Sequence, residues 1–287
     1  MEKQDLVAVQ NIKKSFGDNL VLKGISFELN SQEVVAFTGV NGAGKTTTIK
    51  ILLGLESQSE GKVKFLINKK QDVGVMLQDV SVPENMQVIE WLTLINKYSI
   101  RPTKNLEDLL NEVGISKYKN YLCSELSGGN KRKLQFAAAL VNHPKLIILD
   151  EPTVGLDYQS RKSFWNLVDK KVKDDQLSVL VVTHDINEIA DFTDRLLLLS
   201  NGNLVLIKET SVIKADIDDS GKVKIARRAD INRLKPLSLT WIGDDTIISD
   251  QLRSDVAKIL DQGVSFVDIS IEKKTFQQYI DEVIENE

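Results

Sequence analysis

The sequence predicts an α/β protein whose first part is built on a mainly parallel sheet and whose last part is a small α+β domain. Two observations predict the first part. Short β-branched and apolar runs alternate with segments of helical periodicity, and a glycine-rich loop joins one such run to a helix. Strands that alternate with helices favour a parallel sheet with helices on its faces. From residue 221 onward, short alternating runs and two amphipathic segments predict the smaller domain.

Each element of the first part has its own signal. Residues 34–38 predict a buried strand that ends at the glycine-rich loop. Apolar residues then recur at helical spacing over residues 49–53, and Gly54 predicts the end of that helix. Residues 146–149 and 179–182 predict two more buried strands, with a helix at residues 160–171 between them. Residues 83–123 show helical faces without a strand, which predicts a helical insertion that we extend to about residues 83–140.

A polar stretch at residues 210–220 predicts a domain boundary, which gives a large domain at residues 1–210 and an accessory domain at residues 221–287. In the accessory domain, residues 222–226 and 238–242 predict strands, and Leu252, Val256, Ile259 and Leu260 mark a helix. Residues 267, 269 and 271 alternate as a half-buried strand, and residues 276–284 form a final amphipathic helix.

Composition limits the classes of function. The chain has 287 residues, of which 42% are apolar and 27% charged, as in ordinary globular proteins. The net charge of −4 gives no support for a nucleic-acid-binding surface, and we interpret the basic residues 131–133 as a solvated helix face. The single cysteine, Cys123, excludes a disulfide framework, fits a reducing compartment and is expected to be buried.

The apolar runs are shorter than the roughly 18 residues that cross a bilayer. The first five residues are polar and lack the apolar region of a signal peptide. We therefore expect a soluble, cytosolic protein, with any membrane spans supplied by another chain.

A phosphate-binding loop is the first functional motif. Residues 39–46 fit G-x-x-x-x-G-K-[ST] at a strand-to-helix junction. The glycines let backbone amides approach phosphate oxygens, and the helix N-terminus faces the same anion. Lys45 is expected to reach the β- and γ-phosphates, and Thr46 to ligate Mg²⁺. The residues expected to bind the nucleotide in this loop are Gly39, Val40, Asn41, Gly42, Ala43, Gly44, Lys45, Thr46 and Thr47.

An acidic strand end is the second motif. The apolar run at residues 146–149 ends in Asp150 and Glu151, and Pro152 prevents the strand from continuing. Asp150 is placed to hold Mg²⁺ through water, and Glu151 could polarise an attacking water as a general base.

With these motifs the sequence resembles the ATP-binding subunits of ABC transporters over about residues 5–208, with the motifs in the family's order. The resemblance implies the P-loop NTPase fold of the ABC ATPases, including an N-terminal antiparallel β subdomain. It implies that Phe16 stacks on adenine and that Gln78 touches Mg²⁺ and the catalytic water. It also implies that Asp150 and Glu151 are the magnesium aspartate and catalytic glutamate, and that His184 contacts the γ-phosphate.

Residues 126–130 resemble the signature motif of that family. The resemblance implies that Ser127, Gly128 and Gly129 bind ATP held by the other subunit, and that Asp157 lies in a D-loop that crosses the dimer interface. A chain with one phosphate loop and one signature then makes two ATP sites as a homodimer. The implied cofactors are ATP and Mg²⁺, and the implied partner is an integral membrane permease. The chain itself is then expected to be cytoplasmic and peripheral on the inner face of the cell membrane.

Three segments resemble bacterial exporters of drugs, antibiotics and bacteriocins: residues 82–88, 127–134 and 153–157. Asn130 stands where many members carry glutamine, Tyr158 where proline is frequent, and residues 61–78 are shorter than usual. The leading hypothesis is an ATPase that powers export of a drug, peptide or lipid-like substrate. The alternatives are an importer ATPase and a non-transport ABC ATPase. A GTPase is disfavoured because Asn96-Lys97-Tyr98-Ser99 lacks the aspartate of a guanine-specific motif. The accessory domain is either regulatory or dimer-stabilising, or a passive extension.

Overall fold

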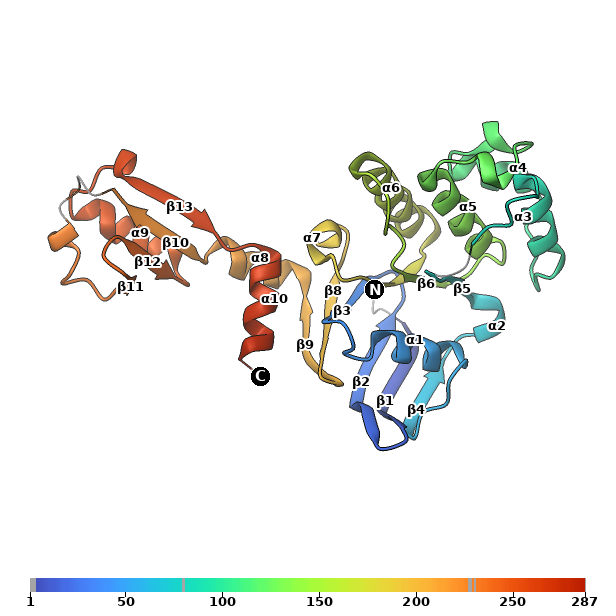
Figure 1. Ribbon diagram of the computed structural model, residues 1–287, viewed down its shortest axis with the longest axis horizontal. Coiled ribbons are helices and arrows are strands. Elements are labelled where there is room, and N and C mark those ends of the chain that lie inside the picture. Colours follow the sequence, from blue (N-terminus) through green and yellow to red (C-terminus); the bar gives the residue numbers. More distant parts are fainter. Residues whose placement is uncertain (1–3, 79–80, 227–228, 230, 287) are drawn as a thin grey trace. The chain divides into compact units, whose positions relative to one another are not determined.

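The chain divides into two compact units, Met1–Ile207 and Lys208–Glu287. The computed structural model describes residues 4–78, 81–226, 229 and 231–286. Residues 210–220, where the sequence predicted a boundary, do not form an open linker, because Thr210–Asp218 is helix α8 of the second unit. Figure 1 shows the elements of both units.

A six-stranded sheet forms the centre of the first unit, in the order β5-β6-β7-β3-β8-β9. The pairs β5–β6, β6–β7, β7–β3 and β3–β8 are parallel. Four of its strands, β3 and β6 to β8, are almost wholly buried, as expected for a parallel sheet with covered faces. The strands are β3 (Val34–Gly39), β5 (Val73–Met76), β6 (Leu146–Asp150), β7 (Ser178–Val182), β8 (Arg195–Ser200) and β9 (Asn203–Glu209).

A second sheet is antiparallel and has the strand order β2-β1-β4. In the sequence, β1 and β2 come before the phosphate loop and β4 comes after it. Its strands are β1 (Asp5–Phe16), β2 (Asn19–Asn30) and β4 (Glu60–Phe65). Helix α1 (Lys45–Leu53) belongs to one buried apolar cluster with both sheets, through side chains such as Ile12, Phe37 and Ile49. The helix that starts at the phosphate loop is therefore fixed by packing against both sheets.

The helical insertion consists of α3 (Val88–Lys97), α4 (Leu106–Glu112) and α5 (Gly128–Leu140), with short 3₁₀ turns at Ser116–Tyr118 and Cys123–Glu125. These three helices lie together in Figure 1. Helix α5 contacts α3, α4, strand β5 and α6 (Tyr158–Asp175), so the insertion packs on the β5 side of the sheet. The remaining helices of this unit are α2 (Lys69–Asp72) and α7 (Ile186–Ile189).

The second unit is a four-stranded antiparallel sheet, β11-β12-β10-β13, with three helices. Its apolar core includes Val223, Ile247 and Ile259. The strands are β10 (Gly221–Ile225), β11 (Thr240–Ile242), β12 (Thr246–Ser249) and β13 (Ile269–Lys273), and the other helices are α9 (Leu252–Asp261) and α10 (Phe276–Glu285). Short 3₁₀ turns lie at Ile231–Arg233 and Phe266–Asp268.

The α/β class, the antiparallel subdomain, the helical insertion and the α+β ending predicted from the sequence are confirmed. Three details were wrong. Strand β12 was not predicted. Val267 is not part of β13, because it lies in the 3₁₀ turn before that strand and is 76% exposed. Strand β13 is mostly exposed rather than half-buried.

Candidate functional site

The phosphate loop lies between β3 and α1 with the geometry that its glycines require. Gly44, the N-cap of α1, has a φ of 111° and leaves the helix start without a side-chain cap or an acidic residue in the first turn. A Cβ on Gly39 would meet the carbonyl oxygen of Leu199 at 2.0 Å. The uncapped first turn leaves amide donors that an anion can satisfy.

Lys45 lies in this loop with its ammonium group turned onto the loop backbone. Its Nζ donates to the carbonyl oxygens of Gly39 at 2.6 Å and Val40 at 3.1 Å. Burial lowers the pKa of Lys45, and the nearby carboxylates of Glu151 and Asp150 oppose that shift. A bound polyphosphate would supply the negative charge that favours the ammonium form, so this residue fits an anionic ligand.

One cavity of about 250 Å³ brings the two sequence motifs together. Oxygen atoms of three kinds of group line it: a threonine hydroxyl, a glutamine amide and two carboxylates. Oxygen ligands of this type suit Mg²⁺, which is usually held by one or two carboxylates together with substrate phosphates. The lining consists of Val21, Asn41, Gly42, Gly44, Lys45, Thr46, Thr47, Gln78, Asp150, Glu151 and Val182.

Glu151 is held in an unusual backbone conformation at the end of β6. Its φ is 47°, a left-handed value that is uncommon for a residue with a side chain. Its amide donates to the carbonyl oxygen of Val182 on the adjacent strand at 2.9 Å. The Nδ1 atom of His184 lies 2.9 Å from the Glu151 Oε1 atom. The carboxylate is 13% exposed and the imidazole 62% exposed, so His184 is the more solvent-accessible partner in this contact.

The signature residues and the D-loop lie in a different place. Ser127 is the N-cap of α5, where its side chain accepts from the amide of Asn130 at 3.4 Å. A pocket of about 310 Å³ beside them is lined by Gly128, Gly155 and Leu156 among others, and Gln78 lines this pocket as well as the cavity above. Neither Ser127 nor Gly129 is among the described residues that line the cavity at the phosphate loop.

Asp157 caps helix α6. Its carboxylate accepts from the backbone amide of Ser160 at 2.9 Å and from the Ser160 hydroxyl at 2.8 Å. The hydrogen bond from the Ser160 amide, together with the hydroxyl bond, lowers the pKa of Asp157. A Cβ on Gly129 would meet the Ser160 Oγ atom at 2.9 Å, so Ser160 joins the D-loop to the signature turn. Ser160 was missed in the sequence, where Asp157 alone carries an N-cap signal for this helix.

The basic residues 131–133 are half-buried rather than solvated, which corrects the interpretation made from the sequence. Lys131 and Arg132 line the pocket beside the signature turn. Cys123 is buried as predicted, and burial raises the pKa of its thiol.

Phe16 lies at the end of β1 with 47% of its side chain exposed, outside the lining of the phosphate cavity in the described part of the chain. An exposed aromatic ring is available for stacking. Of the residues expected to have a role at the ATP site, the structure therefore brings together the phosphate loop, Gln78, Asp150 and Glu151, with His184 attached through Glu151. It places Phe16, Ser127, Gly129 and Asp157 elsewhere on the same unit.

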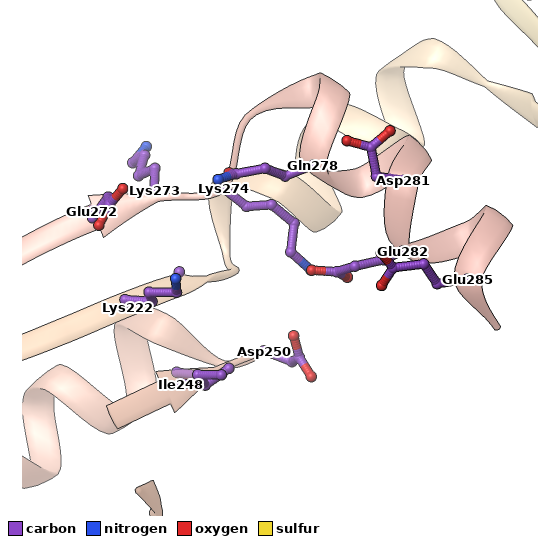
Figure 2. Close-up of a pocket in the computed structure, with 12 residues that line it drawn as sticks. Lys222, Ile248, Asp250, Glu272, Lys273, Lys274, Gln278, Asp281, Glu282 and Glu285 are labelled. Carbon is purple, nitrogen blue, oxygen red and sulfur yellow. The ribbon is translucent and has the colours of Figure 1, made fainter. Parts of the chain in front are cut away.

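The second unit contains none of these residues. It has a pocket of about 240 Å³, lined mainly by charged side chains of β10, β13 and α10. Figure 2 shows these side chains. Lys274 Nζ lies 2.6 Å from Glu282 Oε2 within this pocket. Among the residues the structure describes, no group of three or more His, Cys, Asp or Glu side chains could by itself hold a metal ion. None of the helices in the described ranges is long and apolar enough for a membrane crossing.

The fold and the converging phosphate loop and carboxylates define a P-loop ATP-binding protein. The family model described as "ABC transporter" matches residues 22–154. The putative hemin import ATP-binding protein HrtA of Staphylococcus aureus is 32% identical over 218 residues, which cover 69% of this chain and 98% of HrtA. The linearmycin resistance ATP-binding protein LnrL of Bacillus subtilis is 32% identical over 214 residues, which cover 70% of this chain and 68% of LnrL.

A solved dimeric structure of MJ0796, a bacterial ABC transporter cassette, has the same fold. Its TM-score is 0.63 at 24% sequence identity, and the match covers 71% of this chain and 99% of that one. The chain belongs to the ABC transporter family and is an ATP-binding subunit with the ATPase activity of that family.

Proposed function

We propose that this chain binds and hydrolyses MgATP to power export of a drug, peptide or lipid-like substrate through a separate membrane permease. The observation that carries the proposal is the cavity in which Lys45, Thr46, Gln78, Asp150 and Glu151 converge. These residues supply, in one place, a charge for the phosphates, oxygen ligands for a metal and a carboxylate base.

The proposed chemistry follows from the position of each side chain. Lys45 and the loop amides would hold the β- and γ-phosphates, and Thr46, Asp150 and Gln78 would hold Mg²⁺, which would neutralise charge on the transferred group. Glu151 takes a proton from the attacking water. The water oxygen bonds to the γ-phosphorus, and the bond between the γ-phosphorus and the β–γ bridging oxygen breaks. The products are ADP and inorganic phosphate. His184 contacts the γ-phosphate from its position next to Glu151.

The working unit that we propose is a homodimer with two ATP sites. Ser127 and Gly129 lie outside the lining of the phosphate cavity of their own chain, which supports a role in the site of a second copy. A helix N-terminus with bare glycine amides, as at α5, suits a bound γ-phosphate. Asp157, at the start of α6 beside the signature turn, then lies at the interface. MJ0796, which has the same fold, forms a dimer.

The direction of transport is proposed from the exporter-like segments at residues 82–88, 127–134 and 153–157, and from the resistance role in the name of LnrL. The name of HrtA speaks of import, so an importer ATPase is the second candidate. We propose a domain at residues 1–210 for ATP hydrolysis and a regulatory or dimer-stabilising domain at residues 221–287. The chain would work on the inner face of the cell membrane, bound to its permease.

A transport assay tests the proposal. The Glu151→Gln variant with bound ATP would be used to capture the permease from membranes of the source organism. The captured membrane protein and the wild-type chain would then be reconstituted in proteoliposomes with ATP outside. Accumulation of a labelled drug, peptide or lipid inside the vesicles supports export. ATP-dependent loss of a preloaded solute from the lumen would instead make the chain an importer subunit, and no coupled movement in either direction would remove the transport role.

A further inference from the structure

Phe16 is partly exposed to solvent, and one face of its ring is in contact with another side chain. It closes β1 and precedes Gly17, where a Cβ would meet no atom within 4 Å. Phe16 is 47% exposed, so a large apolar side chain is left partly open to solvent. The exposed part of the ring can accept a flat ligand such as a purine base.

The other face of the ring is occupied by Lys14. Its ammonium nitrogen lies 4.6 Å from the ring centroid, within the range of a cation–π contact. The same nitrogen donates to Glu56 Oε2 at 3.0 Å and to the carbonyl oxygen of Ser57 at 2.7 Å. The Lys14 side chain is only 12% exposed, so its ammonium group is held in place rather than moving in solvent.

The partners of Lys14 belong to the segment that follows α1, the helix that begins at the phosphate loop. The amides of Leu55 and Glu56 donate to the carbonyl oxygen of Lys50 at 2.8 and 3.2 Å, so this segment is fixed to the C-terminal end of α1. Lys14 therefore connects Phe16 to the far end of the helix whose start would hold the phosphates. This connection sets the position of the ring relative to the phosphate loop.

We propose that Lys14 is a positioning residue for the nucleotide base: it holds Phe16 from beneath while the base stacks on the open face. A cation on one face draws electron density from the ring, which reduces repulsion between the ring and the π-electrons of a base on the other face. The proposal rests on the proposed ATP-binding function and on the adenine-stacking role that the family resemblance implies for Phe16. It assigns to Lys14 an effect on base binding but not on phosphate binding.

The test compares ATP with magnesium tripolyphosphate, which carries phosphates without a base. Binding of both to the full chain would be measured by calorimetry for wild type, Lys14→Met, Lys14→Arg, Phe16→Ala and Lys13→Met. Lys13 is the matched control, since it lies on the same strand and forms an ion pair with Glu60 at 2.8 Å. We expect Lys14→Met to weaken ATP binding about fivefold and tripolyphosphate binding not at all, because only the base contact is affected. Lys14→Arg should restore most of the ATP affinity, and Lys13→Met should change neither ligand.

A second readout follows the stack itself. The fluorescence of 2-aminopurine riboside triphosphate falls when its base stacks, so bound probe should be brighter on Lys14→Met than on wild type. Equal losses for ATP and tripolyphosphate would overturn the proposal, because Lys14 would then act on the fold of the phosphate loop. Unchanged ATP affinity in Lys14→Met together with weakened ATP binding in Phe16→Ala would overturn it while leaving the stacking role intact. Unchanged ATP affinity in Phe16→Ala would remove the stacking role itself.

Discussion

At the scale of single residues, the contact between Glu151 and His184 is the most informative feature of the site. Glu151 has a left-handed backbone conformation, and its carboxylate lies 2.9 Å from the His184 Nδ1 atom. The Glu151 amide donates a hydrogen bond to the Val182 carbonyl oxygen on the adjacent strand, which fixes this backbone conformation. Backbone conformations of this kind cost of order 1–3 kcal/mol and gather at functional sites. The conformation therefore supports the role of general base that we propose for Glu151.

Replacement of that base gives the first prediction. Glu151→Gln should lower the rate of ATP hydrolysis by about 100-fold or more, because general-base catalysis is lost. ATP binding should stay close to wild type, because the phosphate loop is unchanged. Phosphate release and calorimetric ATP titration measure the two effects. Lys45→Ala is the contrasting variant and should lose ATP affinity itself. Hydrolysis at the wild-type rate in Glu151→Gln would show that another group acts as the base.

Asp157 gives a prediction about pH. The hydrogen bonds from Ser160 lower the pKa of its carboxyl in the folded state, so its charged form stabilises the fold above the unfolded-state pKa of about 3.9. That contribution is lost as the pH falls through the folded-state value. Asp157→Asn should therefore melt below wild type at pH 7, and the difference in Tm should shrink below about pH 4. A difference in Tm that stays constant or grows toward acid pH would contradict the proposed charge effect.

Some positions of single residues could be predicted from the sequence and others could not. The phosphate loop and the pair Asp150–Glu151 were readable because their spacing and strand ends carry the chemistry. The position of Lys14 under Phe16 was not readable, because its partners Glu56 and Ser57 come from a segment about 40 residues away in sequence. The half-buried state of residues 131–133 was missed for a similar reason: packing around α5 depends on distant loops.

At the scale of elements, strong periodicity was predictive and short or polar segments were not. The buried strands β6 and β7 and helix α10 follow from apolar patterns alone. Helix α8 was not predicted because Asp216 and Asp218 make its sequence polar, although Ile213 in the same helix is buried. Strand β12 has only four residues, and its pairing with β10 and β11 carries no local signal.

The junction of β3 and α1 gives a prediction at this scale. Gly39→Ala should destabilise the first unit by roughly 3 kcal/mol, because its Cβ would lie 2.0 Å from the Leu199 carbonyl oxygen and β3 or β8 must move. Gly42→Ala is the matched control: its φ is 81° and no atom lies within 4 Å of the added Cβ. It should cost only the left-handed penalty of about 1 kcal/mol. Thermal unfolding followed by circular dichroism compares the two, and equal costs would mean that the close approach of β3 and β8 is unimportant.

At the scale of the whole molecule, each unit has its own core and the ATP chemistry belongs to the first. Within that unit the phosphate loop and the signature turn face different pockets, which share only Gln78 as a lining residue among those described. We therefore propose, as our central claim, that Ser127 and Gly129 act on the ATP of a partner copy.

Complementation between two inactive variants tests that claim most directly. Lys45→Ala destroys the phosphate loop of one copy, and Ser127→Arg destroys the signature of the other, so each variant alone should hydrolyse almost no ATP. An equimolar mixture should regain about a quarter of the wild-type rate, because half of the dimers are mixed and each mixed dimer holds one intact composite site. If the mixture stays as inactive as its two parents while forming mixed dimers, the ATP site is complete within one chain and the central claim is wrong.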